Sequence, residues 1–548
     1  MSHFSTNRIY LFYGFLILSF LLLTGRLFEL QLLNGDRYRA LAEGNRIKKE
    51  IIPAPRGIIY DRHKQPLVRN RPIYRLKKEF CEGDHCFEEI AREEALRIEA
   101  GGGKKAADLR LDVGRDYLFG QSLAHVLGYL GEASGDEVKK GPWQLGDLLG
   151  RTGVEEEEDS RLRGQNGGTI YEVDTQGNRI REIGKVEALA GQDLFLSLDG
   201  QLSQIAFEAL RGRPGAVVAT EAKTGQVLVL VSSPAFDPNH LRPEDLTDEK
   251  KPMFNRAIGG QYPPGSTFKI VTATAGVEEG KVTEETTYVD EGFIQIGEYV
   301  YKNWYYSQYG KTEGEIGLVR AIKRSTDTFF YKTGEWVGAN KLAEWGKAFG
   351  LGRLSGIDLA GEMAGLVPTP EWKEKTLGEK WFLGNTYHLA IGQADLLTTP
   401  LQVNMMASVI ANGGKLCSPK IKQAEKTQAC LDLKLKPETL KLIKEGMKEA
   451  CSTGGTAFPF FDFRVPTRKQ GSDEQSESGS YFSLQVGCKS GTAEYGDPEG
   501  KTHAWLTAFA PVDDPEIVVT ALVEGGGEGS YVAAPIVKEV MEAWFHGR

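Results

Sequence analysis

The chain has 548 residues, of which 41% are hydrophobic and 26% are charged, and its formal net charge at pH 7 is −9. This length exceeds one ordinary domain and predicts about two to four folded units. The negative balance, without a long basic run, argues against a nucleic-acid-binding surface, so we expect no nucleic-acid partner.

The first predicted element is an apolar helix near the amino terminus. Residues 9–25 have the sequence IYLFYGFLILSFLLLTG, carry no charge and lie between Arg8 and Arg26. At about 1.5 Å per residue, this run nearly covers the hydrocarbon core of a membrane, so we expect residues 9–28 to form a transmembrane helix. A cleaved signal peptide is the alternative, but no small-x-small cleavage site follows the run.

Residues 34–195, which precede a change of sequence pattern at residue 196, begin with strand and turn chemistry. The stretch PAPRGIIYDRHKQPLVRN at 53–70 combines prolines, a glycine and a short β-branched run, which favours a hairpin. From Cys81 to Asp108 the chain is acidic and then glycine-rich, which indicates a weakly packed excursion or linker.

From residue 196 onward, helical and strand patterns mix. LSLDGQLSQIAFEAL predicts a capped amphipathic helix, and AVVATEAKTGQVLVLVSSPAFDPN predicts a hairpin. FSLQVGC and EIVVTALVEGG are typical of strands, APIVKEVMEAWF is typical of a helix, and the polar stretch 467–480 is typical of a solvated loop. Because the strands and helices do not alternate strictly, the pattern predicts an α+β domain over 196–548, with an antiparallel sheet packed against helices.

The six cysteines show no CxxC metal-binding framework. Two pairs lie close in sequence and could form disulfides outside the cytoplasm: Cys81 with Cys86, and Cys417 with Cys430. We interpret Cys451 and Cys488 as buried small residues.

Ser266 and Lys269, in QYPPGSTFKIVTATAG, form the only Ser-x-x-Lys pattern of the chain. On a helix that begins at Ser266, positions i and i+3 share a face, so the amine can reach the hydroxyl. Burial against Phe268 and Ile270 would lower the pKa of the lysine and let it take the serine proton. The alternative is a plain helix start, with Ser266 as the N-cap after two prolines and a glycine.

Two further motifs decide between these interpretations. Ser325-Thr326-Asp327 opens a predicted helix, where the alternative role is again a cap. Lys-[Ser/Thr]-Gly occurs three times, beginning at Lys223 in a hairpin turn, at Lys332 in a predicted helix, and at Lys489 after the strand FSLQVGC. A serine acyl enzyme needs such a triplet on a strand, and Ser-x-x-Lys, Ser-x-Asn and Lys-Thr-Gly are the known set in penicillin-binding proteins and class A β-lactamases.

With these motifs, the chain resembles class B penicillin-binding proteins over nearly its whole length. Further similar stretches are PRGIIYDR, LAHVLGYLGEAS, GRTGVEEEEDSRLRGQNG, AIGQADLLTTPLQ and THAWLTAFAP. DTFFY, FGLGRLSGIDLAGEMAGLVPTPEWK and KSGTAE are more similar to the elongation type, penicillin-binding protein 2, than to the division type.

The resemblance implies a peptidoglycan D,D-transpeptidase with a β-rich pedestal and a serine β-lactamase-like catalytic domain. Ser266 would attack the penultimate D-alanine of a stem pentapeptide, with Lys269 as general base and Ser325 as proton relay. Asp327 stands where the middle motif has asparagine, as often occurs in elongation-type members. An acidic side chain at this position affects the protonation of the groups near Lys269. The backbone amides of Ser266 and Thr492 would form the oxyanion hole.

The remaining implied roles concern substrate and partners. Lys489 of the triplet Lys489-Ser490-Gly491, with the hydroxyls of Ser490 and Thr492, would hold the substrate carboxylate. Stem peptides and β-lactams are the expected ligands, and the expected partners are a polytopic shape-elongation glycosyltransferase and an elongation scaffold protein. No cofactor is implied. Some elongation-type members bind zinc ahead of the middle motif, but residues 290–327 hold Asn303 and no His or Cys, so we expect no zinc.

The resemblance also implies a single-pass protein of the cytoplasmic membrane, with residues 1–8 in the cytoplasm and the catalytic domain outside. Residues 71–115 are short for the membrane-distal head of the family. A division-type transpeptidase, a D,D-carboxypeptidase or β-lactamase, and a non-catalytic scaffold of the wall-synthesis complex are the alternatives. His503 is expected to have a structural hydrogen-bonding role and not to act as a base.

Overall fold

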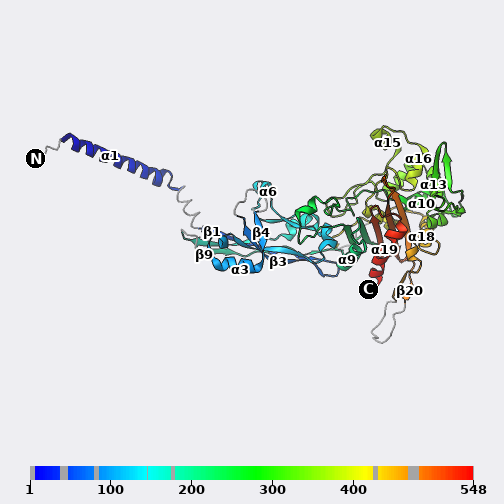
Figure 1. Ribbon diagram of the computed structural model, residues 1–548, viewed down its shortest axis with the longest axis horizontal. Coiled ribbons are helices and arrows are strands. Elements are labelled where there is room, and N and C mark those ends of the chain that lie inside the picture. Colours follow the sequence, from blue (N-terminus) through cyan, green and yellow to red (C-terminus); the bar gives the residue numbers. More distant parts are fainter. Residues whose placement is uncertain are drawn as a thin grey trace, which may run out of the picture.

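The computed structural model describes residues 6–36, 47–78, 86–144, 146–174, 179–423, 430–466 and 481–546. Figure 1 shows three parts in chain order: an isolated helix that extends away from the rest, an elongated β-rich part, and a larger part in which helices surround a sheet. The three sequence motifs at Ser266, Ser325 and Lys489 lie in the third part, farthest from the amino-terminal helix.

The amino-terminal helix is exposed along its whole apolar surface. Helix α1 (Thr6–Phe28) continues as the π-helical turn η1 (Glu29–Leu33). It is long and apolar enough to cross a membrane, and none of its apolar window is buried against other residues. An apolar helix of this length without a protein partner is typical of a membrane anchor.

The elongated part contains two sheets and several short helices. One sheet has the order β1-β8-β9, and the other has the order β10-β2-β3-β4, with β5 paired to β3. The predicted hairpin at 53–70 is confirmed as β2 and β3, which pair antiparallel. The elements of this part are β1 (Ile47–Ile52), β2 (Ile59–Tyr60), β3 (Pro66–Lys77), β4 (Phe87–Ile90), α3 (Arg92–Gly101), α4 (Gly103–Ala107), β5 (Leu109–Tyr117), η2 (Gly120–Leu123), α5 (Ala124–Leu127), β6 (Leu130–Glu132), α6 (Gly135–Lys140), β7 (Leu148–Gly150), α7 (Gly153–Glu157), α8 (Asp159–Leu162), β8 (Gly167–Val173), β9 (Arg179–Val186) and β10 (Leu194–Phe195).

The segment from Cys81 to Asp108, which the sequence predicts to be a weakly packed excursion or linker, is mostly exposed over its described residues but has regular secondary structure. Its described residues form β4, α3 and α4, which lead into β5. The physical reason is that β3 is long, pairing with both β4 and β5, and it therefore gives this segment a sheet to fold against. Ala95 of α3 is fully buried.

The third part is built on a five-stranded antiparallel sheet with the order β12-β11-β23-β22-β21. The predicted helix at 196–210, the hairpin at 216–239 and the last strand and helix are confirmed as α9, β11–β12, β23 and α19. The elements are α9 (Gly200–Ala209), β11 (Gly215–Glu221), β12 (Val227–Ser233), η3 (Pro243–Leu246), η4 (Gly265–Phe268), α10 (Lys269–Glu278), β13 (Thr287–Asp290), β14 (Phe293–Ile296), β15 (Tyr299–Lys302), α11 (Trp304–Tyr309), β16 (Gly314–Gly317), α12 (Leu318–Arg324), α13 (Asp327–Val337), α14 (Ala339–Ala348), α15 (Pro370–Leu377), α16 (Leu383–Ala390), α17 (Pro400–Ala411), β17 (Lys415–Leu416), β18 (Leu431–Asp432), α18 (Pro437–Ala450), η5 (Phe458–Phe460), β19 (Arg464–Pro466), β20 (Tyr481–Ser483), β21 (Gly487–Glu494), β22 (Thr502–Ala510), β23 (Ile517–Val523) and α19 (Gly529–His546). The predicted loop 467–480 lies outside the described residues.

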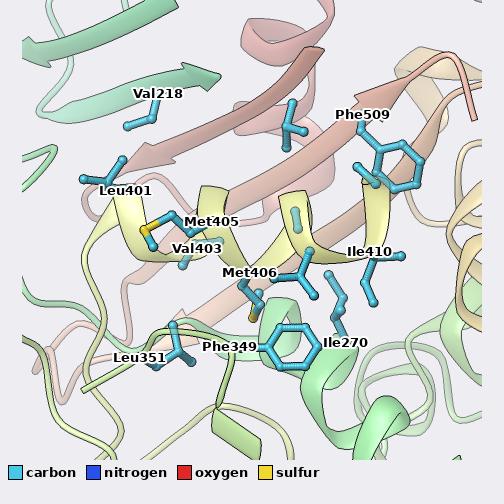
Figure 2. Packing of buried hydrophobic residues seen from close by; sticks show 14 of the residues in the cluster. Val218, Ile270, Phe349, Leu351, Leu401, Val403, Met405, Met406, Ile410 and Phe509 are labelled. Atoms are coloured by element: carbon cyan, nitrogen blue, oxygen red, sulfur yellow. The ribbon is translucent and has the colours of Figure 1, made fainter. Parts of the chain in front are cut away.

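Helix α17 connects the sheet to the helices that carry the catalytic motifs. Its threonine N-cap, Thr399, and the proline at the next position start the helix, and nearly every residue from there to Ala411 is buried. Figure 2 shows Met406 beside Ile270 of α10 and Phe349, while Leu401 and Met405 lie toward Val218 of the sheet. The helix is thus the core layer that fixes α10 relative to the sheet.

The β-rich part and the third part are joined by hydrogen bonds and share one core. The amide of Leu196 donates to the Tyr60 carbonyl at 2.9 Å, and the next amide, that of Ser197, donates to the Ile421 carbonyl at 2.7 Å. Ser197 Oγ also contacts the Val227 carbonyl at 2.7 Å. A single cluster of buried apolar side chains runs across this junction.

The cysteines depart partly from expectation. The predicted pair Cys417–Cys430 is confirmed as a disulfide. Cys451 and Cys488 were interpreted as separate buried residues, but they form a second disulfide, with a Cα–Cα distance of 5.5 Å. That interpretation failed because the end of α18 packs beside β21, which brings together residues separated by 37 positions. Cys81 lies outside the described residues, so its predicted pairing with Cys86 is not described.

Candidate active site

Ser266 lies in a tight turn that leads into a buried helix. The turn η4 begins at Gly265 and passes directly into α10 at Lys269. The N-cap of the turn is Pro264, without a side-chain cap, so the alternative role of Ser266 as a helix cap is wrong. Gly265 has φ +54, and a Cβ there would lie 2.8 Å from the Thr492 carbonyl oxygen. Only glycine allows this close approach between the turn and the strand that faces it.

Lys269 is fully buried on the first turn of α10. Its Nζ donates to Asp327 Oδ1 at 2.6 Å, to the Ser325 carbonyl at 2.8 Å and to Ser325 Oγ at 3.2 Å. Burial lowers the pKa of Lys269, and the neighbouring Asp327 carboxylate opposes this effect. None of these three hydrogen bonds goes to Ser266, so the amine is held by the middle motif.

Ser325 lies in the break between α12 and α13 and does not open a helix, contrary to the sequence-based expectation. It ends α12 in the left-handed conformation with φ +54, and α13 begins at Asp327 after Thr326 as the N-cap. A non-glycine residue in this region is energetically unfavourable, and such residues concentrate at functional sites. The conformation places Ser325 Oγ within 2.9 Å of Lys489 Nζ and 3.2 Å of Lys269 Nζ.

The triplet that begins at Lys489 lies within the edge strand β21. The sequence placed it after a strand formed by FSLQVGC, but the strand instead begins at Gly487 and pairs with β22 through the whole triplet. Lys489 is fully buried, and this burial lowers its pKa well below the ordinary value, with the nearby Lys269 acting in the same direction. Ser490 Oγ donates to Thr456 Oγ1 at 2.9 Å.

These motifs meet at one cavity of about 530 Å³. Six of the eight site residues expected from the sequence line it: Ser266, Ser325, Asp327, Ser490, Gly491 and Thr492. The remaining two, Lys269 and Lys489, lie behind its wall and contact Ser325 from two sides. The cavity therefore presents hydroxyl groups to a ligand and keeps two amines out of water behind them.

The other two Lys-Thr-Gly triplets lie outside this cavity. Lys223 begins the turn between β11 and β12, as predicted, and its Nζ forms an ion pair with Asp514 at 2.6 Å. Lys332 lies in α13, again as predicted, and pairs with Glu335 one helical turn along. Each of these two lysines forms an ion pair away from the cavity, so neither triplet belongs to the site.

Several residues that support the site were not assigned such a role from the sequence. Asp290 is buried and accepts hydrogen bonds from Asn303 Nδ2 at 2.9 Å and Thr328 Oγ1 at 2.7 Å. Asn303 Oδ1 in turn accepts from the Asp327 amide at 3.1 Å, and the Trp304 amide donates to Asp327 Oδ2 at 2.9 Å. These contacts orient Asp327 toward Lys269, and no local pattern in the sequence signals them. Within the described ranges, no group of three or more His, Cys, Asp or Glu side chains is arranged to hold a metal ion.

Two further residues lie beside the edge strand. Gln393, within the stretch AIGQADLLTTPLQ, donates from Nε2 to the Thr492 carbonyl at 3.3 Å. His503 accepts a hydrogen bond from the Gly525 amide at 3.2 Å, which agrees with the structural role expected for it. Burial lowers the pKa of this imidazole.

Comparison with known proteins identifies the family. Residues 215–542 match the penicillin-binding protein transpeptidase domain, and residues 85–196 match the penicillin-binding protein dimerisation domain. The peptidoglycan D,D-transpeptidase MrdA of Haemophilus influenzae is 30% identical, over 100% of this chain and 92% of its own. The corresponding MrdA of Escherichia coli K12 is 29% identical, over 96% and 92%.

Solved structures agree in fold. The penicillin-binding protein PBP2 of Helicobacter pylori, in a complex with MreC, has a TM-score of 0.75 and 27% identity, over 91% of this chain and 98% of its own. A chain from a peptidoglycan synthase complex has a TM-score of 0.75 and 31% identity, over 99% of both chains. The chain belongs to the penicillin-binding transpeptidases and is a peptidoglycan D,D-transpeptidase of the elongation type.

Proposed function

We propose that Ser266 is the nucleophile that carries the acyl group in this transpeptidase. The observation that carries the proposal is the position of Ser325 Oγ, which contacts Lys269 Nζ and Lys489 Nζ at the wall of the cavity that Ser266 lines. This arrangement gives a hydroxyl nucleophile, a desolvated amine and a bridging hydroxyl in a single cavity.

Acylation follows from this arrangement. Ser266 Oγ attacks the carbonyl carbon of the penultimate D-alanine, and its proton passes to Lys269, whose burial favours the neutral amine. Negative charge on the carbonyl oxygen is stabilised by the backbone amides of Ser266 and Thr492. When the carbon–nitrogen bond to the terminal D-alanine breaks, Ser325 relays a proton to the leaving amine. The terminal D-alanine departs, and the serine ester remains.

Cross-linking reverses these proton movements. The amine of a second stem peptide attacks the ester carbon, the bond to Ser266 Oγ breaks, and a proton returns to Ser266 through Lys269. In the preceding acylation step, Ser490 and Thr492, with Lys489 behind them, hold the carboxylate of the terminal D-alanine until it departs. Asp327, fixed by Asn303 and Trp304, keeps Lys269 in position during both steps.

The test is covalent labelling by a fluorescent penicillin. A penicillin presents a reactive carbonyl and a carboxylate at about the separation that they have in the D-Ala-D-Ala end of the donor peptide. We expect the wild-type chain to be labelled and Ser266→Ala not to be labelled. Thr267→Ala is the matched control, because the Thr267 hydroxyl is buried and donates to the Pro264 carbonyl without lining the cavity. Equal labelling of Ser266→Ala and wild type would show that another residue is the nucleophile.

We further propose the domain division and location that the sequence predicts. Residues 34–195 form a non-catalytic pedestal and residues 196–548 form the transpeptidase domain, which is supported by the family matches at 85–196 and 215–542. Helix α1 supports a single-pass anchor, with residues 1–8 in the cytoplasm and the catalytic domain on the outer face. Protease added to spheroplasts, from which the wall and any outer membrane have been removed, should cleave the catalytic domain, whereas a purely cytoplasmic location would protect it.

The proposed partners are a polytopic glycosyltransferase and an elongation scaffold protein. The similarity to a PBP2 solved with MreC and to a chain of a peptidoglycan synthase complex supports this proposal. Co-purification of the full chain with these two classes of protein from the membrane is the direct test.

A further inference from the structure

A second cavity adjoins the catalytic one. It has a volume of about 610 Å³, and its walls include Tyr262, His388, Tyr495 and His503. Gln393 and Glu494 line both cavities, so they form the boundary between them. A ligand bound covalently at Ser266 can therefore extend past Gln393 and Glu494 into the second cavity.

Glu494 occupies a defined position on the edge strand. Side chains alternate along a strand, so Glu494 lies on the same face of β21 as Ser490 and Thr492. It is exposed, and in the described part of the chain its carboxylate has neither an ion pair nor a side-chain hydrogen bond. No lysine or arginine lines the second cavity, and Lys302 and Arg324, which line the catalytic cavity together with Glu494, form no ion pair with it. The strand thus presents two hydroxyls followed by a carboxylate without an ion-pair partner.

The other walls of the second cavity are aromatic. Tyr495 stacks on His503 with a centroid distance of 4.0 Å, and His503 meets Tyr262 edge-on at 5.3 Å. Burial lowers the pKa of both His388 and His503, so neither imidazole supplies a positive charge at neutral pH. A carboxylate beside aromatic faces, without a protein cation, suits an alkylammonium group.

The proposed catalytic roles fix the direction in which the donor peptide runs. Its carboxylate lies at Ser490, and its reacting carbonyl lies between Ser266 and Thr492, so the preceding residues continue toward Glu494. Because β21 is an edge strand, an extended peptide can pair with it, and this direction makes the pairing antiparallel. Glu494 is two residues beyond Thr492, or about 7 Å along the strand, which an extended chain covers with about two residues.

We propose that Glu494 and the second cavity form a subsite for a primary ammonium group on the residue that precedes the two D-alanines of the donor peptide. The subsite rests on the proposed role of Ser266. It selects donors that still carry a free side-chain amine, and it disfavours donors whose amine is already acylated by an earlier cross-link.

The test compares acylation of the full chain by two penicillins that differ in one group. One carries a side chain that ends in a primary amine, and the other is its N-acetylated form. The penicillin side chain occupies the position of the donor residues before the reacting carbonyl. We expect wild type to react about fivefold faster with the free amine, as an exposed ion pair would allow. Glu494→Gln should remove this preference, and Glu494→Lys should reverse it.

A ratio of two rates on the same variant is insensitive to partial unfolding, because both probes acylate the same serine. Glu499→Gln is the matched control, since Glu499 is exposed, pairs with Lys501 and lines neither cavity. High salt should also reduce the wild-type preference. Equal rates of wild type with both penicillins would overturn the subsite and leave the acyl serine intact. If neither penicillin reacts, the proposed role of Ser266 fails, and the subsite that rests on it fails as well.

Discussion

Loss of the disulfide between Cys451 and Cys488 should destabilise the protein and slow acylation. The two residues are separated by 37 positions, so the chain-entropy relation gives about 4 kcal/mol for the cross-link, against about 3 kcal/mol for the 13-residue separation of Cys417 and Cys430. Cys488 directly precedes Lys489, and Cys451 begins the segment that leads to Thr456, which contacts Ser490. Removing the bond therefore loosens the strand that faces Ser266.

The assay pairs urea unfolding with penicillin acylation for two double variants, Cys451→Ala with Cys488→Ala and Cys417→Ala with Cys430→Ala. We expect both to lose unfolding free energy, and only the first to lose acylation rate, by about tenfold, because small misplacements of catalytic groups are costly. The second pair is the control, since it lies outside the cavity lining. An unchanged acylation rate in the first variant, despite lower stability, would refute the link between this disulfide and the site.

Three other outcomes follow from buried polar groups. Burial lowers the pKa of His125 to about 4, so between pH 6.5 and 4 the unfolded chain binds more protons than the folded one. Stability should therefore fall by about 3 kcal/mol as the pH falls through this window, and His125→Gln should abolish this dependence in urea unfolding. Glu155→Ala leaves the buried Arg56 and Arg115 without this partner and should cost about 3–5 kcal/mol by the same assay. Asn303→Ala should slow penicillin acylation about tenfold, because it removes the acceptor for the Asp327 amide.

Each of these has a clear control. His63 is half-exposed, so His63→Gln serves as the control for replacing a histidine outside the buried site. Asp136 forms an exposed pair with Lys139, and Asp136→Ala should change stability by less than about 0.5 kcal/mol. If Asn303→Ala acylates at the wild-type rate, Asp327 does not depend on this contact. A pH profile of His125→Gln that matches wild type would place the titration elsewhere.

The candidate site could be predicted from the sequence where its chemistry lies in short local patterns. Ser266 and Lys269 are three residues apart and the triplet at Lys489 is continuous, so each of these motifs could be read from a short stretch of sequence. Asp290 and Asn303 gave no such signal, because they act through tertiary hydrogen bonds to residues on α13. The disulfide between Cys451 and Cys488 was missed for the same reason.

The fold shows the same contrast between local and distant causes. Helix α9 could be predicted because it has its own N-cap and an amphipathic helical pattern. The hairpin β11–β12 could be predicted because two apolar strands flank a turn. The helices α3 and α4 are not predicted because their sequences are polar or glycine-rich; α3 packs against β3 and β5, and α4 packs against α3. Ser325 was placed at the start of a helix, since its left-handed conformation is imposed by the packing of α12 against α13 and by its contacts with two lysines.

The junction at Leu196 and Ser197 has a mechanical consequence. Successive backbone amides there donate first to Tyr60 of the β-rich part and then to Ile421 of the third part. A load on such a connection is shared by several hydrogen bonds and by a continuous apolar core, so the two parts should turn together as one lever and not flex at a hinge. A rotation of the β-rich part about its end next to helix α1 would then move the cavity in the third part, which lies farthest from that helix, more than it moves any point nearer to it (Figure 1).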